Sequence, residues 1–222
     1  VWGSVENKLH ALSAGEKFIN CSCGEQTNVE KGNLHLGKYT CPNCHNEAHL
    51  NKLPNSRLPL QTRLFAVEYI DPNSGERAYK KADKGDKDLY KKASADLEQL
   101  WEDLPIPIQD IPVIGRTDPR PVSLGYKKYH ELFNNRQLLC LALILQKLIK
   151  VDNPIHRELL LLAFSDSLAC NNRFCSYAFG YQKLTPLFGL HAFRRISRPV
   201  EGNVWGAAMG RGSFSSCVEK VI

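Results

Sequence analysis

Four cysteines near the start of the chain have the spacing of a metal site. Cys21 and Cys23 are separated by one residue, Cys41 and Cys44 by two, and seventeen residues lie between the pairs. Zn²⁺ takes four soft ligands in a tetrahedron, and thiolates meet that need. Two turns brought together by a hairpin supply this geometry. We therefore predict that Cys21, Cys23, Cys41 and Cys44 bind one structural zinc ion in a small ribbon-like β module.

The spacing leaves alternatives for the ligand set. The first pair is tighter than the usual two-residue gap, and His45 and His49 are spare donors nearby, one of which can replace a poorly placed cysteine. Free or disulfide-linked thiols are the other interpretation. Four protein ligands leave no open position for water or substrate, so the predicted zinc is structural.

The sequence lacks the usual catalytic signatures. It contains no Gly-x-Ser-x-Gly elbow, no phosphate loop ending in Gly-Lys-Ser and no His-Glu-x-x-His. Asp166 and Ser167 lie late in an apolar helical pattern, which is typical of a satisfied polar pair. No catalytic residue is predicted from these patterns.

The C-terminal part of the chain interleaves cations, amides and aromatic residues. The formal net charge is +6. Lys and Arg neutralise phosphates, Asn and Gln pair with base edges, and aromatic rings stack on bases. A solvated basic surface above core aromatics explains the pattern equally well. The candidate nucleic-acid contacts here are Asn171, Asn172, Arg173, Lys183, Arg194, Arg195 and Arg198.

Composition predicts a globular, cytoplasmic chain. Hydrophobic residues make up 43% of its 222 residues, and no apolar run approaches the ~18 residues that span a membrane. No signal-peptide pattern opens the sequence. Cysteines outside the two pairs have no regular spacing, which is typical of a reducing compartment; they are Cys140, Cys170, Cys175 and Cys217. Because the sequence begins with Val1, we interpret it as a piece of a larger protein.

The expected fold class is α+β. Residues 64–70 and 77–81 are predicted to form a hairpin around a turn at 71–75. An amphipathic helix is expected to start near Asp86, and prolines from 105 to 121 are expected to form an extended arm. Apolar helices are expected from Asn134 or Asn135 to Ile149 and from Pro154 to about Cys170, packed as an antiparallel pair.

Three domains are predicted from this pattern. Residues 1–55 form the zinc-ribbon module, and residues 56–121 hold the β-hairpin, the amphipathic helix and the proline-rich arm. Residues 122–222 form a mainly helical domain with a basic and aromatic C-terminal segment.

Several stretches occur in an order that resembles a known family. Cys-Pro-Asn-Cys at 41–44 is followed by the hairpin, the amphipathic helix and the proline-rich arm. Leu-Phe-Asn-Asn-Arg-Gln-Leu-Leu at 132–139 and Glu-Gly-Asn-Val-Trp at 201–205 come later. This order is similar to that of prokaryotic adenine-specific DNA methylases containing a zinc ribbon, in which a Leu-Phe-x-x-Arg-Gln-Leu-Leu signature opens a long apolar helix. The resemblance covers the chain from about Phe18 to its end.

The resemblance implies methyl transfer from S-adenosylmethionine to N6 of adenine in DNA, on a base flipped out of the duplex. The Asp-Pro-Pro-Tyr motif and the glycine-containing cofactor motif of the family are missing, since the sequences at 71–74 and 118–121 do not match. No catalytic residue is therefore carried over. The chain is interpreted as the insert that carries the zinc ribbon and a share of DNA recognition, with the rest of the methyltransferase chain as its partner. Arg136 and Gln137 match the signature and join the candidate DNA contacts, with bracing of the helix as the alternative.

Two other functions stay open at this point. One is a non-enzymatic zinc-ribbon adaptor that binds a protein or nucleic-acid partner. The other is a ribbon-bearing nuclease or RNA-processing subunit. Steep salt dependence of DNA binding would favour the methyltransferase or the nuclease, because phosphate contacts release counterions.

Overall fold

A computed structural model describes residues 2–4, 18–28, 34–35, 38–49, 62–113, 120–190, 193, 196, 199–206 and 212–221. These residues form helices and small antiparallel sheets, so the α+β prediction is confirmed. The strands are β1 (Trp2–Ser4), β2 (Phe18–Asn20), β3 (Gln26–Asn28), β4 (Leu34–His35), β5 (Lys38–Thr40), β6 (Glu47–His49), β7 (Thr62–Leu64), β8 (Ala66–Ile70), β9 (Arg77–Lys81), β10 (Ser176–Ala178) and β11 (Lys183–Thr185). The α-helices are α1 (Lys84–Gln99), α2 (Arg120–Ser123), α3 (Asn135–Leu148), α4 (Pro154–Leu168) and α5 (Phe214–Val218).

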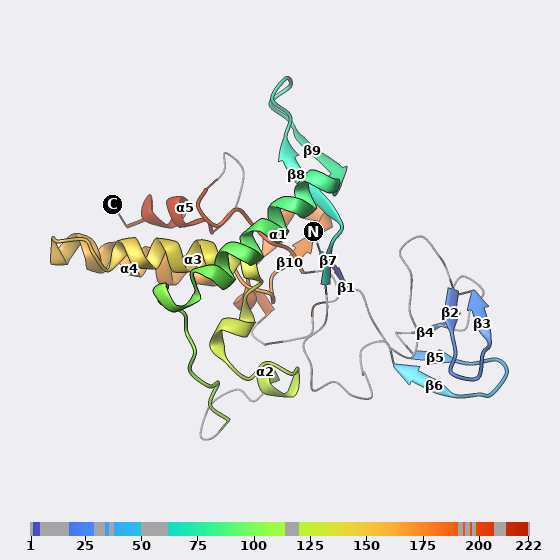
Figure 1. Cartoon of the computed structure of the whole chain (residues 1–222). Coiled ribbons are helices and arrows are strands. Elements are labelled where there is room, and N and C mark those ends of the chain that lie inside the picture. The colour runs from blue at the N-terminus through green and yellow to red at the C-terminus, as the bar shows by residue number, and fades with distance from the viewer. Residues whose placement is uncertain are drawn as a thin grey trace.

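The cysteine-bearing region consists of two small sheets. Strands β2 and β3 form a hairpin, and β4, β5 and β6 form a three-stranded antiparallel sheet. A hydrogen bond of 2.9 Å between the Thr27 and Tyr39 hydroxyls connects the two sheets, and both side chains are buried. In Figure 1 these strands lie to one side of the helical part of the molecule.

Strand β1 does not belong to these sheets. It pairs antiparallel with β7, with Trp2 opposite Leu64 and Ser4 opposite Thr62. The segment before the cysteines is therefore bonded to the segment after them. The predicted domain limits at 55 and 121 stay predictions.

The predicted hairpin is present, but its first strand is divided at Phe65. Leu64 ends β7, which pairs with β1, and Ala66 begins β8, which pairs with β9. The pairing changes from β1 to β9 at Phe65, whose carbonyl accepts a hydrogen bond from the Ala82 N–H. The turn lies at 71–75 as predicted, with the Asp71 carboxylate accepting from the backbone N–H of Asn73.

Helix α1 begins two residues before the predicted start. Asp83 caps it by accepting a bond from the Asp86 N–H, while the Asp86 carboxylate accepts from the Asp83 N–H. This reciprocal capping box satisfies two backbone donors that would otherwise lack partners, which fixes the first turn at Lys84. Leu97 and Leu104 then pack against α3 in a buried cluster.

The proline-rich arm is an extended strap as far as residue 113. Its carbonyls at Pro107 and Gln109 accept bonds from the N–H groups of His130 and Tyr129, and Ile111 donates to the Lys127 carbonyl. Prolines lack a backbone donor but keep the carbonyl acceptor, which is why the strap bonds mainly as an acceptor. The strap lies against residues 127–130 and leads the chain toward α3.

Helices α3 and α4 form the expected antiparallel pair, and they lie side by side in Figure 1. Asn134 caps α3 and Asn153 caps α4, where Pro154 occupies the first turn. The main core lies between these helices and α5, and includes Leu141, Phe164 and Phe214.

Gly212 precedes α5 at a position that a side chain cannot occupy. Its φ is +70°, and a Cβ there would lie 2.3 Å from Sγ of Cys170. We expect Gly212→Ala to lower the free energy of unfolding by about 2–4 kcal/mol, because backbone strain and overpacking add. Gly75, with φ of +69° in open space, gives the matched control, and Gly75→Ala should cost about 1 kcal/mol. Urea unfolding of both variants checks this; equal losses would show that contact with Cys170 does not matter.

Candidate metal centre and polar network

The four predicted cysteines come together at one point. Their Sγ atoms all lie within 4.8 Å of one another. Cys21 and Cys44 are 3.6 Å apart at sulfur, and Cys23 and Cys41 are 3.7 Å apart. A tetrahedron with Zn–S bonds of about 2.3 Å separates its sulfurs by about 3.8 Å, whereas a disulfide needs about 2.05 Å. The arrangement thus has the dimensions of a four-thiolate metal site, and every described cysteine is a free thiol.

Each cysteine pair sits on a tight turn that directs both thiols to the same point. The Cys21 carbonyl accepts from the Gly24 N–H at 3.0 Å, and the Cys41 carbonyl accepts from the His45 N–H at 3.0 Å. Gly24 and His45, the residues directly after each pair, have φ of +90° and +56°. The turn at the first pair therefore ends in a residue with positive φ, as the turn at the second pair does, but it is one residue shorter.

The Cys41 and Cys44 thiols differ in how readily they ionise. Burial opposes ionisation of Cys41, but backbone N–H groups of Cys44 and Asn43 outweigh it and lower the pKa of Cys41 to about 6. At Cys44 the Asn46 backbone N–H favours the thiolate, yet burial and the neighbouring thiols raise its pKa to about 12. The two pKa shifts are opposite because negative charge on one sulfur disfavours ionisation of a neighbouring sulfur. A divalent cation removes this conflict, because a coordinated thiol is deprotonated outright.

Other polar groups near the sulfurs support the cluster without joining it. The Asn43 side chain donates to Sγ of Cys23 at 3.8 Å. His45, named as a substitute ligand, is exposed and is not part of the metal-ligating group. The side chain of His49 lies outside what the structure describes. The four cysteines are thus the candidate ligands.

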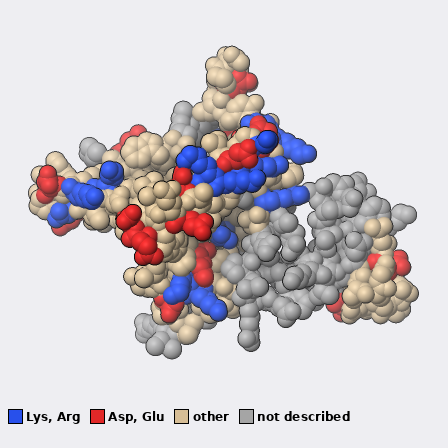
Figure 2. All heavy atoms as spheres, viewed as in Figure 1, with Lys and Arg blue, Asp and Glu red and all other residues tan. Residues whose placement is uncertain are grey.

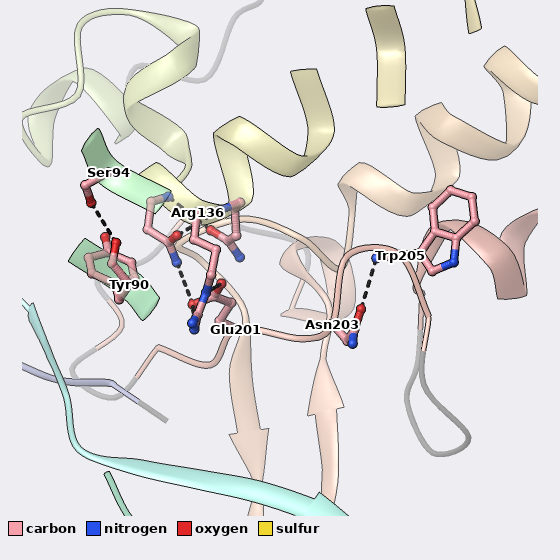
Figure 3. A network of polar contacts seen from close by, with 8 residues as sticks. Tyr90, Ser94, Arg136, Glu201, Asn203 and Trp205 are labelled. Atoms are coloured by element: carbon pink, nitrogen blue, oxygen red, sulfur yellow. Dashed lines mark hydrogen bonds and ion pairs between the residues drawn. The ribbon is translucent and has the colours of Figure 1, made fainter. Parts of the chain in front are cut away.

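A second polar site joins stretches that are distant in the sequence (Figure 3). Nε and Nη2 of Arg136, in the first turn of α3, donate to the two carboxylate oxygens of Glu201 at 2.7 and 3.0 Å. The Asn134 side chain donates to the same carboxylate at 3.1 Å. The guanidinium also lies over the Tyr90 ring, 5.5 Å from its centroid. The Glu201 side chain is only 7% exposed, so its charge depends on these partners.

The Leu-Phe-x-x-Arg-Gln-Leu-Leu and Glu-Gly-Asn-Val-Trp stretches therefore meet in space, and a third stretch joins them. The backbone N–H and the Nε of Arg173 donate to the carbonyls of Leu132 and Phe133, both at 2.8 Å. Beyond Glu201, the Asn203 side chain accepts from the N–H groups of Trp205 and Gly206 and shapes the following turn. The stretches at 132–139 and 201–205 and the Arg173 segment thus form one hydrogen-bonded unit.

The amides predicted to contact base edges are buried instead. Gln137 is 1% exposed, and its Oε1 accepts from the Asn134 N–H in the capping box of α3. Asn171 donates to the carbonyls of Ser167 and Gly212, and Asn172 donates to those of Leu168 and Ala169. Buried amides with backbone partners hold local structure, so a base-edge role for these three residues does not fit the folded chain.

The predicted cationic contacts have different surroundings. Arg136 and Arg173 belong to the network above, and bracing of the helix describes Arg136 better than free display to a phosphate. Lys183 is exposed, with its ammonium 5.0 Å from the centroid of the Tyr181 ring. Arg194, Arg195 and Arg198 lie outside the described residues. On the face shown in Figure 2, Lys and Arg alternate with Asp and Glu over the helical part.

Sequence reasoning missed Glu201 as a site residue. Its stretch was quoted for the resemblance, but a single acidic residue in an irregular segment carries no periodic signal. Its partner Arg136 is 65 residues away in the sequence, so only the fold could join them.

Comparison of the chain with protein-family models, with curated proteins and with solved structures finds no match. Among the described residues, no helix combines the length and the apolar character needed to cross a membrane.

Proposed function

We propose that Cys21, Cys23, Cys41 and Cys44 hold one structural zinc ion in a zinc ribbon. The observation that supports this proposal is the convergence of four Sγ atoms within 4.8 Å on two turns of like shape. Thiolate softness and closed four-coordination favour Zn²⁺ over Mg²⁺ or Ca²⁺, which prefer oxygen ligands. In a module with strands of only two or three residues, metal binding supplies folding energy that its own core cannot.

We further propose that the chain is the zinc-ribbon and DNA-recognition segment of an S-adenosylmethionine-dependent DNA adenine-N6 methyltransferase. The support is the order of sequence motifs, together with the meeting of two of the motif-bearing stretches, 132–139 and 201–205, through Arg136 and Glu201. The catalytic and cofactor motifs are missing from the sequence, so binding of S-adenosylmethionine and methyl transfer are assigned to the rest of the methyltransferase chain. A zinc-ribbon adaptor without enzymatic activity is the alternative.

A DNA-binding titration of the zinc-loaded protein at two salt concentrations tests this proposal, with random duplex as competitor. Each phosphate contact contributes about −0.9 to the slope of log K against log salt. Salt-sensitive binding supports a recognition segment. A lack of DNA binding even at low salt would favour the adaptor.

The C-terminal arginines provide the sharper version of this test. We expect Arg194→Ala combined with Arg195→Ala to weaken duplex binding and to reduce the salt slope by about 2, one unit for each lost phosphate contact. Lys147→Ala combined with Lys150→Ala removes the same charge from exposed positions at the end of α3 and is the control. If both pairs reduce the slope equally, net charge and not a contact surface explains the binding.

A further inference from the structure

The structure contains one buried polar group that nothing above explains. Nε2 of Gln137 is closed to solvent and has no hydrogen-bond partner. Exchanging the amide oxygen and nitrogen cannot remedy this, because Oε1 is needed to accept from the Asn134 N–H. The capping box thus fixes an NH₂ group, with two donors, in a place where the described part of the chain offers no acceptor. An unsatisfied buried donor of this kind calls for an acceptor that the described residues do not supply.

Gln137 lines a hollow beside the first turn of α3. Thr62, Asn134, Asn172 and Arg173 contribute its other polar side chains, and the rings of Tyr126 and Phe174 are among its apolar walls. The cavity volume is about 30 Å³, two to three times the ~10–15 Å³ that one water molecule needs. This space suits a group with two oxygen atoms and is too small for a nucleotide.

Gln137 and Arg173 offer N–H donors to this hollow, and the hydroxyls of Thr62 and Tyr126, which also line it, can both donate and accept. Arg173 uses its Nε on the Phe133 carbonyl, and among the described residues no hydrogen bond involves the terminal nitrogens of its guanidinium. The amides of Asn134 and Asn172 are already occupied on both sides. The positive end of the α3 dipole lies at the same place. No carboxylate is found among the described lining residues, and nearby Glu201 is held by Arg136.

We propose that this hollow binds a small carboxylate, which places its oxygens between the Gln137 amide and the Arg173 guanidinium. A carboxylate offers two acceptor oxygens, has the size of the cavity and gains from charge-assisted bonds to a planar guanidinium. The carboxylate belongs to a free small acid or to the side chain of an acidic residue. The proposal does not depend on the proposed zinc ion or on DNA binding.

NMR titration of the whole chain with acetate tests the proposal through the side-chain NH₂ signals of Gln137. We expect acetate to shift these signals saturably with a Kd of about 1 mM, and acetamide, its uncharged counterpart, to bind roughly tenfold more weakly. N-acetylglutamic acid α-amide distinguishes the two sources. Tighter binding than acetate indicates an acidic side chain, and weaker binding indicates a free acid.

Two variants connect the shifts to the hollow. Gln137→Glu keeps the oxygen that caps α3 but replaces the NH₂ with a second oxygen, so acetate binding should be lost. Arg173→Lys keeps the charge and loses the planar fork, so affinity should fall about tenfold even if Gln137→Glu does not fold. If acetate produces no saturable shift and the Gln137 NH₂ exchanges magnetisation with a bound water, the cavity holds water alone and the proposal is wrong.

Discussion

Replacing Cys41 with serine is expected to remove the metal from the chain and to unfold the cysteine-bearing region while the helical part persists. Cys41 is fully buried, and its Sγ is one of the four that lie within 4.8 Å of one another. A serine hydroxyl is a poor zinc ligand because it keeps its proton at neutral pH. Loss of a second-shell partner alone costs about 10–100-fold in metal affinity, so loss of a direct ligand should cost more than about 100-fold.

The structural consequence follows from the small size of the sheets around the metal. Strands β2 to β6 have two or three residues each. Among the described residues of these strands and their turns, the buried side chains are Cys21, Thr27, Tyr39 and Cys41. If the proposed zinc binds there, its binding energy, about 10–16 kcal/mol in small fingers, would be the main stabilising contribution. Helices α3 and α4 have their own core around Leu141 and Phe164 and do not need it.

Elemental analysis and amide hydrogen exchange check this expectation together. The wild-type chain should carry one zinc, and the Cys41→Ser variant should carry none. Exchange should accelerate within 18–49 but not within α3 and α4. Cys140→Ser is the matched control, since Cys140 lies on α3 away from the cluster and should leave the metal in place. One zinc per chain retained in Cys41→Ser would mean that the ligand set is wrong.

Local chemistry explains why much of the fold was predictable. Asn134, Asn153 and Pro154 mark helix starts through bonds within three residues, and α3 and α4 begin where these signals place them. Asp83 was passed over in favour of Asp86, because both are good caps and only the reciprocal bonds between them show which residue is the cap. The division of the first hairpin strand at Phe65 depends on β1, more than 50 residues away, and no local pattern records it.

The candidate sites differ in the same way. The cysteine cluster was predictable because spacing, ligand type and coordination number all lie within one short stretch. The amides Asn171 and Asn172 were misleading because their residue type suits contacts with base edges. They follow the apolar helix α4, where they are buried and donate to the last carbonyls of that helix. Residue type suggests chemistry, but burial decides whether a partner can reach it.

Separating Arg136 from Glu201 is expected to destabilise the helical part. With the Glu201 side chain 7% exposed, Arg136→Met removes the cation that pairs with a buried carboxylate. Removing one member of a buried pair costs about 3–5 kcal/mol. Because the Arg136 side chain is 32% exposed, water can approach Glu201 after the change, and we expect a loss near about 3 kcal/mol.

A double-mutant cycle measures the pair itself. Glu201→Gln keeps the shape and removes the charge, at an expected cost of about 1–2 kcal/mol. In the double variant no charge remains buried, so the losses should not add, and a coupling energy of about 1–3 kcal/mol should appear in urea unfolding. Lys220 and Asp166 form an equally short pair at 2.9 Å with side chains 64% and 57% exposed, and the same cycle there should give less than about 0.5 kcal/mol.

The two cycles together decide what holds the motif-bearing stretches in one unit. A coupling energy well above that of the exposed pair means that the Glu201 carboxylate holds the first turn of α3 in place. It then also stabilises the Arg173 segment, which is bonded to residues 132 and 133. A coupling energy no larger than that of the exposed pair would mean that apolar packing around α3 holds these stretches together. Arg136 would then be available for phosphate contact, as the sequence first suggested.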